Sequence, residues 1–454
     1  MKIPLKPPAF EELIRKIRGA KGNPERIFEV LKRGGGAMHR GEYIHWDKMR
    51  HLEPPEGLSV EEWWLTVKTA RQSLYRTLPF TDAHDHPFRF AMADPVLRLL
   101  HQVDRDVGGQ IQAPEIIVNP QTRDTYLVSS LIEEAITSSQ LEGAATTRKV
   151  AKEMLREGRK PRTRGEQMIF NNYHAMQFIR TITGEKLTPA IVLELQRILT
   201  KNTLDDPKAV GRFRREEDDI HVVDTRDSVV LHTPPNASEL EKRMDRFCRF
   251  ANEMDGDTFI HPVVRAIILH FVPGYDHPFV DGNGRTARAV FYWSMLSRGY
   301  WLTEYISISR ILKGAPGEYA RAYLYSETDE NDVTYFIIHQ LNVILRAIQD
   351  LQKYLAKKST EVHEIEAMIR KSPRLRGLLN HRQIALLSHA LRHPGAIYRI
   401  EGHRQSHKVT YDTARTDLLK LARLKLLEKQ RSGRAFVFLS PPNLATRLRK
   451  ANTK

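Results

Sequence analysis

The chain has 454 residues, of which 41% are hydrophobic, and a formal net charge of +16. This length is sufficient for two or three domains, each with its own core. There is no run of eighteen apolar residues and the first eight residues lack the apolar core of a signal peptide, so we expect a cytoplasmic protein with no membrane partner.

Residues 1–114 are predicted to form an N-terminal helical domain. Residues 58–78 have the pattern of an amphipathic helix, and the pair Trp63 and Trp64 is typical of a core. Whether this domain contributes to target choice or to a homodimer stays open.

Residues 124–143 predict a helix that ends at Gly143. Its apolar positions recur at helical spacing: Leu127, Leu131, Ile132, Ala135 and Ile136. Gly143 is suited to stop the helix, which places Glu142 in the last turn. A carboxylate there opposes the helix dipole by ~0.3 to 1 kcal/mol, so a cation should compensate it; water or a surface arginine is the ordinary answer.

Residues 218–234 have β-branched runs on both sides of a polar turn, a pattern that predicts a hairpin. Farther on, Cys248 lies in a helical pattern, where we expect a small buried hydrophobe. It is the chain's single cysteine, so no intramolecular disulfide forms. The nineteen histidines lack zinc-like spacing.

Residues 277–288 read His-Pro-Phe-Val-Asp-Gly-Asn-Gly-Arg-Thr-Ala-Arg, a composition suited to handling phosphate. His277 can accept a proton near neutral pH, and Asp281 is a hard ligand suited to Mg²⁺. Gly282 and Gly284 precede an apolar helix, whose N–H groups and dipole favour an anion. An EF-hand fits poorly because Ala287 occupies its twelfth position, and neither a Walker loop nor a dinucleotide-binding glycine motif occurs.

These residues match the signature H-x-F-x-[D/E]-G-N-G-R-x-x-R at every fixed position, so the chain resembles the Fic-domain proteins over roughly residues 115–350. The resemblance implies transfer of a nucleotide monophosphate, usually AMP from ATP, to a protein hydroxyl. It implies that His277 is the general base, that Asp281 binds Mg²⁺ and that Phe279 anchors the loop. The implied phosphate contacts are Gly282, Asn283 and Gly284 around the α- and β-phosphates, Arg285 at the β-phosphate and Arg288 at the γ-phosphate.

The resemblance extends to two of the segments above. Ser138, Glu142 and Gly143 are similar to the family's inhibitory motif [S/T]-x-x-x-E-[G/N], which implies that Glu142 pairs with Arg288 and holds the enzyme largely off. The hairpin at residues 218–234 looks like the flap that holds a target segment by strand addition, with an ordinary structural hairpin as the alternative.

Two local features depart from the signature pattern. Asp85-His86-Pro87-Phe88 repeats its first letters without the carboxylate and glycines, so we expect His86 to be a surface or packing histidine. Pro273 and Gly274 interrupt the helix before the loop, which we expect to end by Val272.

The tail is strongly basic. Residues 381–454 contain sixteen Lys and Arg against four Asp and Glu, a net +12. The predicted order is a helix at 382–391, a strand at 397–400, a short helix at 402–406, a long helix at 410–427 and a basic turn leading into a strand at 431–439. This order resembles a winged helix-turn-helix domain. DNA binding would use Lys408, Arg415, Arg431 and Arg434 on phosphates, with Tyr411 and Thr413 near base edges.

We therefore expect a mainly α fold with a Fic-type helical core, a small β-hairpin flap, an N-terminal helical domain and a C-terminal winged helix. The expected domains are residues 1–114, 115–350 with the inhibitory helix at about 124–143, a linker helix at 351–377, and 378–445. The expected function is autoinhibited protein adenylylation with ATP and Mg²⁺, acting on a target protein or on the chain itself. The alternatives are a nucleotide-sensing DNA-binding regulator that modifies only itself, a Fic enzyme with another donor, and removal of AMP. The winged helix could also dock protein instead of DNA.

Overall fold

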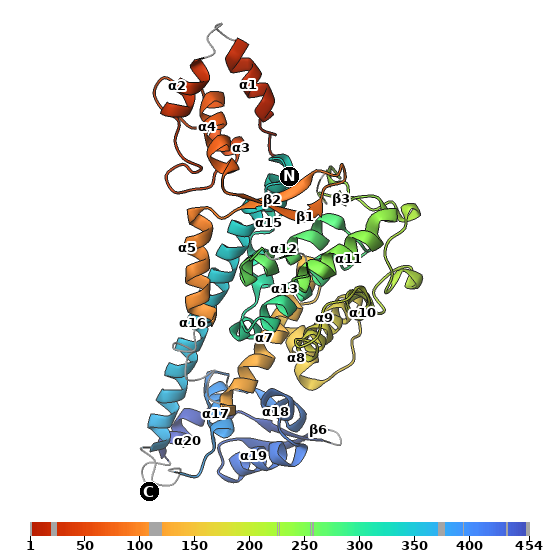
Figure 1. Cartoon of the computed structure of the whole chain (residues 1–454). Coiled ribbons are helices and arrows are strands. Elements are labelled where there is room, and N and C mark those ends of the chain that lie inside the picture. Colours follow the sequence, from red (N-terminus) through yellow and green to blue (C-terminus); the bar gives the residue numbers. More distant parts are fainter. Residues whose placement is uncertain are drawn as a thin grey trace. The chain divides into compact units, whose positions relative to one another are not determined.

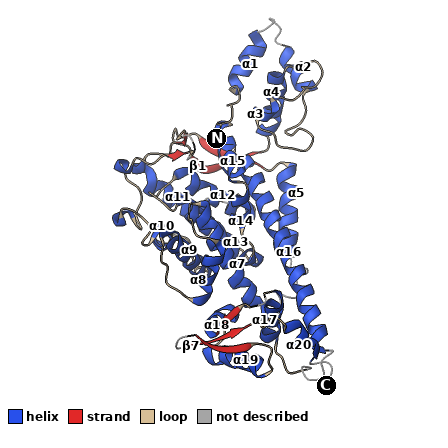
Figure 2. Ribbon diagram, turned by 180° about the vertical axis from the view of Figure 1, so that it is seen from behind, coloured by secondary structure: helices blue, strands red, loops and turns tan. Residues whose placement is uncertain are grey.

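The computed structural model describes residues 2–19, 25–108, 120–224, 226, 228–254, 256, 258–370, 377–393, 395–432 and 435–450. Helices predominate and the strands are short and few (Figure 1, Figure 2), which confirms the predicted mainly α fold. The chain forms two compact units. The first contains Met1–Gly108, His174–Thr303 and Ile308–Arg346, and the second contains Gly109–Tyr173, Glu304–Ser307 and Ala347–Lys454. The predicted domain boundaries fall at other positions and stay predictions.

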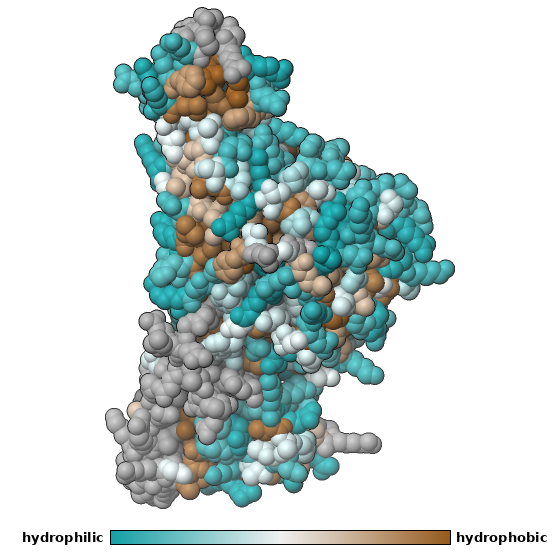
Figure 3. Space-filling model, viewed as in Figure 1, coloured by the Kyte–Doolittle hydropathy of each residue, from teal (hydrophilic) through white to brown (hydrophobic). Residues whose placement is uncertain are grey.

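The N-terminal part of the first unit is a small helical cluster. Its helices are α1 (Phe10–Gly19), α2 (Arg26–Arg33), α3 (Trp46–Met49) and α4 (Val60–Gln72). Trp63 and Trp64 are core residues of this cluster, as predicted. Apolar residues also gather on the face of this cluster that is seen in Figure 3. On α2, Phe28 is 68% exposed.

The prediction of a helix through residue 78 is wrong. Helix α4 begins at a capping box between Ser59 and Glu62 and ends at Gln72. Strand β1 (Tyr75–Thr81) follows and pairs antiparallel with β2 (Pro87–Ala91). The physical reason is local: residues 75–81 are rich in aromatic and β-branched side chains, and Pro79 cannot donate inside a helix.

The rest of the first unit is built around two buried helices, α12 (Pro262–Asp276) and α13 (Asn283–Ser297), which pack against each other. Almost every residue of α12 is buried, including its whole central run from Val263 to Pro273. The other elements of this unit are α5 (Asp94–Val103), η1 (Asp104–Gly108), α10 (Pro189–Thr200), η3 (Pro207–Ala209), η4 (Glu216–Asp218), β3 (Val222–Val223), β4 (Val230–His232), η5 (Ala237–Glu239), α11 (Leu240–Ala251), α14 (Ile308–Gly314) and α15 (Pro316–Thr328). Residues of α9 (Arg164–Thr181), η6 (Trp301–Tyr305) and α16 (Thr334–Arg370) are divided between the two units.

The predicted hairpin is present. Strands β3 and β4 pair antiparallel with Val222 opposite His232 and Val223 opposite Val230. Asp224 closes the turn, because its N–H donates to Val229 O over 2.9 Å and its carbonyl accepts from the Ser228 N–H over 2.8 Å.

Helix α12 does not end at Val272 as predicted, but continues through Pro273 to Asp276. Pro273 lies in the last turn, so it removes only its own bond to the preceding turn and the helix tolerates it. The His277 N–H closes that turn by donating to Pro273 O over 3.2 Å. Gly274 is required by packing, since a Cβ there would lie 2.1 Å from the Tyr323 hydroxyl oxygen.

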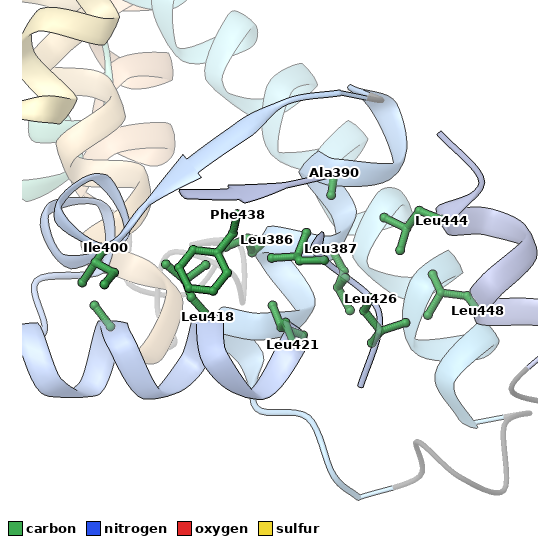
Figure 4. Packing of buried hydrophobic residues seen from close by; sticks show 12 residues of the cluster. Leu386, Leu387, Ala390, Ile400, Leu418, Leu421, Leu426, Phe438, Leu444 and Leu448 are labelled. Atoms are coloured by element: carbon green, nitrogen blue, oxygen red, sulfur yellow. The ribbon is translucent and has the colours of Figure 1, made fainter. Parts of the chain in front are cut away.

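The second unit begins with α7 (Pro120–Leu141) and α8 (Arg148–Glu157) and continues in the tail. The tail elements are α17 (His381–Arg392), β5 (Ile397–Arg399), α18 (Ile400–His407), α19 (Tyr411–Arg423), β6 (Glu428–Ser432), β7 (Ala435–Leu439) and α20 (Leu444–Lys450). The strands form one antiparallel sheet in the order β5-β7-β6. Leucines and Phe438 fill the hydrophobic core of the tail (Figure 4).

The predicted elements of the tail are found in the predicted order, but strand β6 and helix α20 were not predicted, and the long helix is shorter than expected. The long helix ends at Arg423 instead of residue 427, because Lys425 takes a left-handed conformation with φ 58° and turns the chain into β6. Of the predicted linker helix at 351–377, residues 351–370 form the later part of α16, which begins at Thr334, and residues 371–376 lie outside the described residues.

Within the second unit, α18 packs against both α7 and α8. Arg399 pairs with Glu157 over 3.7 Å, and a Cβ on Gly158 would lie 2.9 Å from the Gln405 amide nitrogen.

Over the described residues, no helix is long and apolar enough to cross a membrane.

Candidate active site

His277 occupies the position where α12 ends and the signature loop begins. It takes a left-handed conformation, with φ 42° and ψ 58°. Its Nδ1 lies 2.7 Å from Gly274 O. A carbonyl oxygen only accepts, so Nδ1 carries the proton. In the neutral ring, Nε2 is then the basic nitrogen, which is the state required of a general base.

The carbonyls at the end of α12 are satisfied by side chains from other segments. The last carbonyls of a helix have no intrahelical donor and need one elsewhere. Arg214 donates to His277 O through Nε over 2.7 Å and to Asp276 O over 3.4 Å. His232 Nε2 lies 2.6 Å from Tyr275 O. Three successive carbonyls at the start of the loop are therefore held by two side chains.

Arg214 also binds the loop and the hairpin together. It donates to Pro235 O, just after the hairpin, and its own N–H donates to Pro278 O over 2.9 Å. Burial lowers the pKa of Arg214 from its ordinary value, with the charge of Asp276 acting in the opposite direction. Asp276 itself pairs with Arg243 over 2.9 Å.

Phe279 and Asn283 fix the middle of the loop. The ring of Phe279 is fully buried and stacks on Phe213 at 5.9 Å between centroids and 16° between planes. The Asn283 side chain accepts from the Phe279 N–H over 2.9 Å and donates to the Phe279 carbonyl over 2.8 Å. The predicted anchoring role of Phe279 thus has a structural counterpart, and the Asn283 amide is engaged with backbone.

Gly282 and Asp281 form the turn that starts α13. Gly282 has φ 88°, and a Cβ there would lie 2.9 Å from Thr200 Cγ2, so both conformation and space favour glycine. Its N–H donates to Asp281 Oδ1 over 2.6 Å. The first-turn N–H groups of α13, which include those of Asn283 and Gly284, have no intrahelical acceptor, and such a helix start favours an anion.

Arg285 is completely buried and joins this turn to α10. It donates to Leu199 O over 3.0 Å and to Asp281 Oδ2 over 2.8 Å. Within the described part of the chain its buried Nε–H has no acceptor. A buried donor without an acceptor is costly, so this nitrogen is a candidate for contact with a phosphate oxygen.

Asp281 fits a magnesium ion that is shared with phosphates. Its carboxylate is 37% exposed, and Mg²⁺ is commonly bound through one or two carboxylates together with substrate phosphates. A cage made by protein alone is not seen: over the described residues, no three His, Cys, Asp or Glu side chains are grouped to hold a metal.

Arg288 lies one turn farther along α13, and its side chain is 1% exposed. Burial lowers the pKa of His270 on α12 well below its ordinary value, and the Arg288 charge lowers it further. Arg288 therefore lies near His270, whose own Nε2 is 2.9 Å from the Tyr319 hydroxyl.

The predicted inhibitory residues lie in the second compact unit. Ser138 is buried, and Glu142 is half-buried just after the end of α7. Gly143 has φ 90°, and the next residue, Ala144, donates its N–H to Ser139 O over 2.9 Å. The predicted stop at Gly143 is thus confirmed, while the pairing of Glu142 with Arg288 stays a prediction.

The predicted DNA contacts are distributed around α19 and the tail sheet. Lys408, Tyr411, Arg415 and Arg431 are exposed. Thr413 takes part in the cap of α19, with its hydroxyl 2.8 Å from that of Thr410. Arg434 lies outside the described residues.

His86 is a surface histidine, as predicted: its side chain is 73% exposed and lies 3.3 Å from an Asp82 oxygen. The sequence interpretation missed the roles of Arg214 and His232. The signal available for Arg214 was its place in the Gly-Arg-Phe-Arg run at 211–214; nothing local distinguishes His232 from the other histidines.

Residues 186–295 match the Fic/DOC family, so this part of the chain is a Fic domain. Proteins named protein adenylyltransferase Fic from Drosophila melanogaster and Drosophila grimshawi are 34% and 33% identical over 128 residues, 28% of this chain and 24% of each relative. The chain therefore spans about a quarter of the length of the curated relatives it matches.

Solved structures with similar folds include a Fic family protein from Desulfovibrio desulfuricans G20, with 18% identity and a TM-score of 0.49 over 77% of this chain and 97% of that chain. Fic-1 (residues 134–508) from C. elegans has 17% identity and a TM-score of 0.46 over 78% of this chain and 90% of that chain.

Proposed function

We propose that this chain is a protein adenylyltransferase that moves AMP from ATP to a Ser, Thr or Tyr hydroxyl of a cytoplasmic target protein. The observation that carries the proposal is the orientation of His277. Its Nδ1–H is engaged by Gly274 O, which leaves Nε2 as the basic nitrogen at the head of a loop that runs into a helix N-terminus.

The reaction that these residues suit is a displacement at the α-phosphorus. The target hydroxyl oxygen attacks this atom while its proton passes to Nε2 of His277. The bond from the α-phosphorus to the oxygen bridging to the β-phosphate breaks, and pyrophosphate leaves. Such transfers depend on positioning and on stabilising charge on phosphate oxygens, which the α13 N-terminus and the buried Arg285 are suited to provide.

Asp281 is the residue that would hold Mg²⁺, together with phosphate oxygens of ATP. The bound ion would supply positive charge against the charge on the phosphates. Asp281 Oδ2 also accepts from Arg285, so the same carboxylate would orient an arginine and a metal on one nucleotide.

We also propose that Glu142 restrains the enzyme by pairing with Arg288 and keeping it from the γ-phosphate. The support is chemical: Arg288 is a buried guanidinium on α13, and a buried charge is stable only when it is paired. A carboxylate at the end of α7 lacks favourable interaction with its own helix dipole and gains from such a cation.

The test uses Mg²⁺ with ATP labelled at either the α- or the γ-phosphate. Wild type, Glu142→Gly and Glu142→Gly/His277→Ala are compared, with Glu185→Gly, an exposed loop glutamate, as matched control. We expect α-label on protein with Glu142→Gly and none with the double variant. Only γ-label would indicate phosphotransfer, and no label from either would overturn the proposal in favour of another donor or removal of AMP. Transfer by Glu142→Gly no faster than by wild type would overturn the inhibitory role.

A second proposal concerns the tail, whose element order and β5-β7-β6 sheet favour a winged helix that binds DNA. Its net charge of +12 would attract the phosphate backbone, with Lys408, Tyr411, Thr413, Arg415, Arg431 and Arg434 as contacts. Binding to random duplex DNA should weaken steeply with salt. An affinity insensitive to salt would favour protein docking instead. DNA affinity that changes with ATP, without transfer to a separate protein, would favour the nucleotide-sensing regulator.

A further inference from the structure

His232 joins three elements of the first unit at one point. It ends strand β4, and its side chain is 8% exposed. Nδ1 lies 2.8 Å from the Glu327 carboxylate on α15, and Nε2 lies 2.6 Å from Tyr275 O on α12. Its ring also packs against the Tyr275 ring at 4.5 Å between centroids. The hairpin is thus tied to two helices through one side chain.

These contacts determine the protonation state of the ring. A carbonyl oxygen and an ionised carboxylate both accept and cannot donate. Both nitrogens of His232 therefore carry hydrogen, and the ring is an imidazolium. A neutral ring has a single N–H and would have to give up one of the two bonds.

The bond to Tyr275 O acts at the end of α12, two residues before His277. That carbonyl is one of those that have no donor within the helix, and Arg214 donates to the next two carbonyls. Tyr275 is fixed from another side as well, since its hydroxyl accepts from the Ala83 N–H over 3.2 Å. Loss of the His232 bond would free the carbonyl that precedes the catalytic loop.

The hairpin that His232 holds carries an exposed apolar edge. Val223, Val229 and Val230 are 44%, 42% and 47% exposed. Such an edge is suited to an extended target segment that adds to the hairpin as a strand. A change in how β4 is fixed would therefore change the placement of the target relative to His277.

We propose that His232 is a positioning residue whose imidazolium couples the target-binding hairpin to the end of α12, and that loss of its proton loosens this coupling. The functional part of this inference rests on the proposed transfer to a protein hydroxyl. The coupling itself is a property of the fold and is measurable without activity.

The surrounding charges favour the protonated ring. Burial lowers the pKa of His232, but the hydrogen bond and charge of Glu327, the Tyr275 carbonyl and the charge of Asp276 outweigh it, so the pKa is raised above its ordinary value. Burial raises the pKa of Asp276, while the charges of Arg243 and Arg214 act in the opposite direction and favour its charged form. On the hairpin, His221 lies 3.5 Å from the Thr233 hydroxyl. The coupling is complete below the ordinary histidine pKa of about 6.5 and weakens as the pH rises through the raised value.

The first experiment follows the His232 ring by nuclear magnetic resonance and the hairpin amides by hydrogen exchange, in the full chain, between about pH 6 and pH 9. After correction for intrinsic rates, we expect exchange at residues 222–223 and 230–232 to rise roughly tenfold for each unit by which the His232 pKa is raised. The pH-dependent rise should vanish in Glu327→Gln, because a glutamine amide can donate to a neutral Nδ1 while Nε2–H still donates to Tyr275 O.

The matched control is His86→Gln, which removes an exposed histidine beside a carboxylate and should leave the hairpin profile unchanged. A His232 pKa at or below that of an exposed histidine, or the same pH profile in Glu327→Gln, would overturn the proposal. In a Glu142→Gly background, alkaline pH should raise the KM for protein target more than it lowers kcat, and Glu327→Gln should remove this effect. Absence of any transfer would count against the proposed function, while the exchange data would still decide the coupling.

Discussion

The side-chain amide of Asn283 and the backbone of Phe279 exchange two hydrogen bonds, of 2.9 Å and 2.8 Å. Both residues are buried. Replacing Asn283 by alanine would leave the Phe279 N–H and carbonyl without these partners, at a cost of ~1 to 3 kcal/mol for each buried group. We therefore expect Asn283→Ala to lower the free energy of unfolding by roughly 2 to 6 kcal/mol, measured by chemical denaturation.

The variant Asn283→Asp separates the two bonds. A carboxylate still accepts from the Phe279 N–H but presents an oxygen to the Phe279 carbonyl, so it should be less stable than wild type. If Asn283→Ala unfolds at the same denaturant concentration as wild type, the clamp has no energetic role. Label transfer from ATP is measured on both variants as well. It tells whether Asn283 contacts the nucleotide in addition to holding the loop.

Arg214 should not be replaceable by lysine. Its guanidinium reaches the carbonyls of His277, Asp276 and Pro235, and a single ammonium cannot donate along the same fork. We expect Arg214→Lys to lower kcat for label transfer about tenfold or more, since small displacements of catalytic groups are costly, with little change in ATP affinity measured by calorimetry. The control is Arg212→Lys, which alters a neighbouring pair with Asp218 at 2.8 Å. Equal kcat values for the two variants would contradict a special role for Arg214.

Asp417 is the polar centre of the tail. Its buried carboxylate accepts from Asn380 over 2.7 Å, from Arg382 over 2.6 Å and from Gln383 over 3.2 Å, and His403 lies at 3.2 Å. Burial raises the pKa of Asp417, but the hydrogen bonds from His403, Arg382 and Asn380 outweigh it and hold the pKa below its ordinary value.

A lowered carboxyl pKa means that Asp417 stabilises the tail above the ordinary value of about 3.9 and loses this contribution as the pH falls towards the folded-state value. We expect Asp417→Asn to destabilise the tail by ~3 kcal/mol, as when one partner of a buried charged pair is removed. Thermal unfolding at pH 7 and pH 3 checks both points: the gap between wild type and variant should be smaller at pH 3. An equal gap at both pH values would mean that the charge is not responsible.

Cys248 provides a chemical probe of unfolding in the first unit. It is 5% exposed, and burial, helped by the charge of Asp245, raises the pKa of its thiol to about 12. Since the thiolate is the reactive form, iodoacetamide at pH 8 should modify the folded chain far more slowly than the chain in denaturant. Rapid modification of the native protein, followed by mass spectrometry, would show that α11 opens readily.

The sequence could predict what short-range chemistry determines. Asp281 is followed by Gly282 and Gly284, and then by an apolar helix. This spacing predicts a helix N-terminus beside a carboxylate. Most elements of the tail were also predicted, because their apolar and polar positions follow the period of a helix or a strand, whereas β6 and α20 were not. The helix predicted over residues 75–78 failed because the amphipathic pattern was extended past Gln72 into a segment whose aromatic side chains and Pro79 favour a strand.

The roles that sequence could not predict come from distant partners. Arg214 and His232 meet the end of α12 from segments more than forty residues away, and no local pattern indicates which carbonyl a side chain will reach. The extension of α12 beyond Pro273 has the same origin, since those distant donors satisfy the carbonyls that a proline-containing helix end leaves over.

The packing of α18 on α7 and α8 affects how the tail can be studied. A chain cut before residue 378 would lose more than its basic domain: it would expose to water the sides of α7 and α8 that α18 covers, and α7 is the helix that leads to Glu142. A change of activity in such a shortened chain could therefore result from damage to α7 as well as from loss of the ligand site in the tail. Point substitutions on the exposed side of α19, such as Arg415→Ala, keep that cover in place and are the way to separate the two.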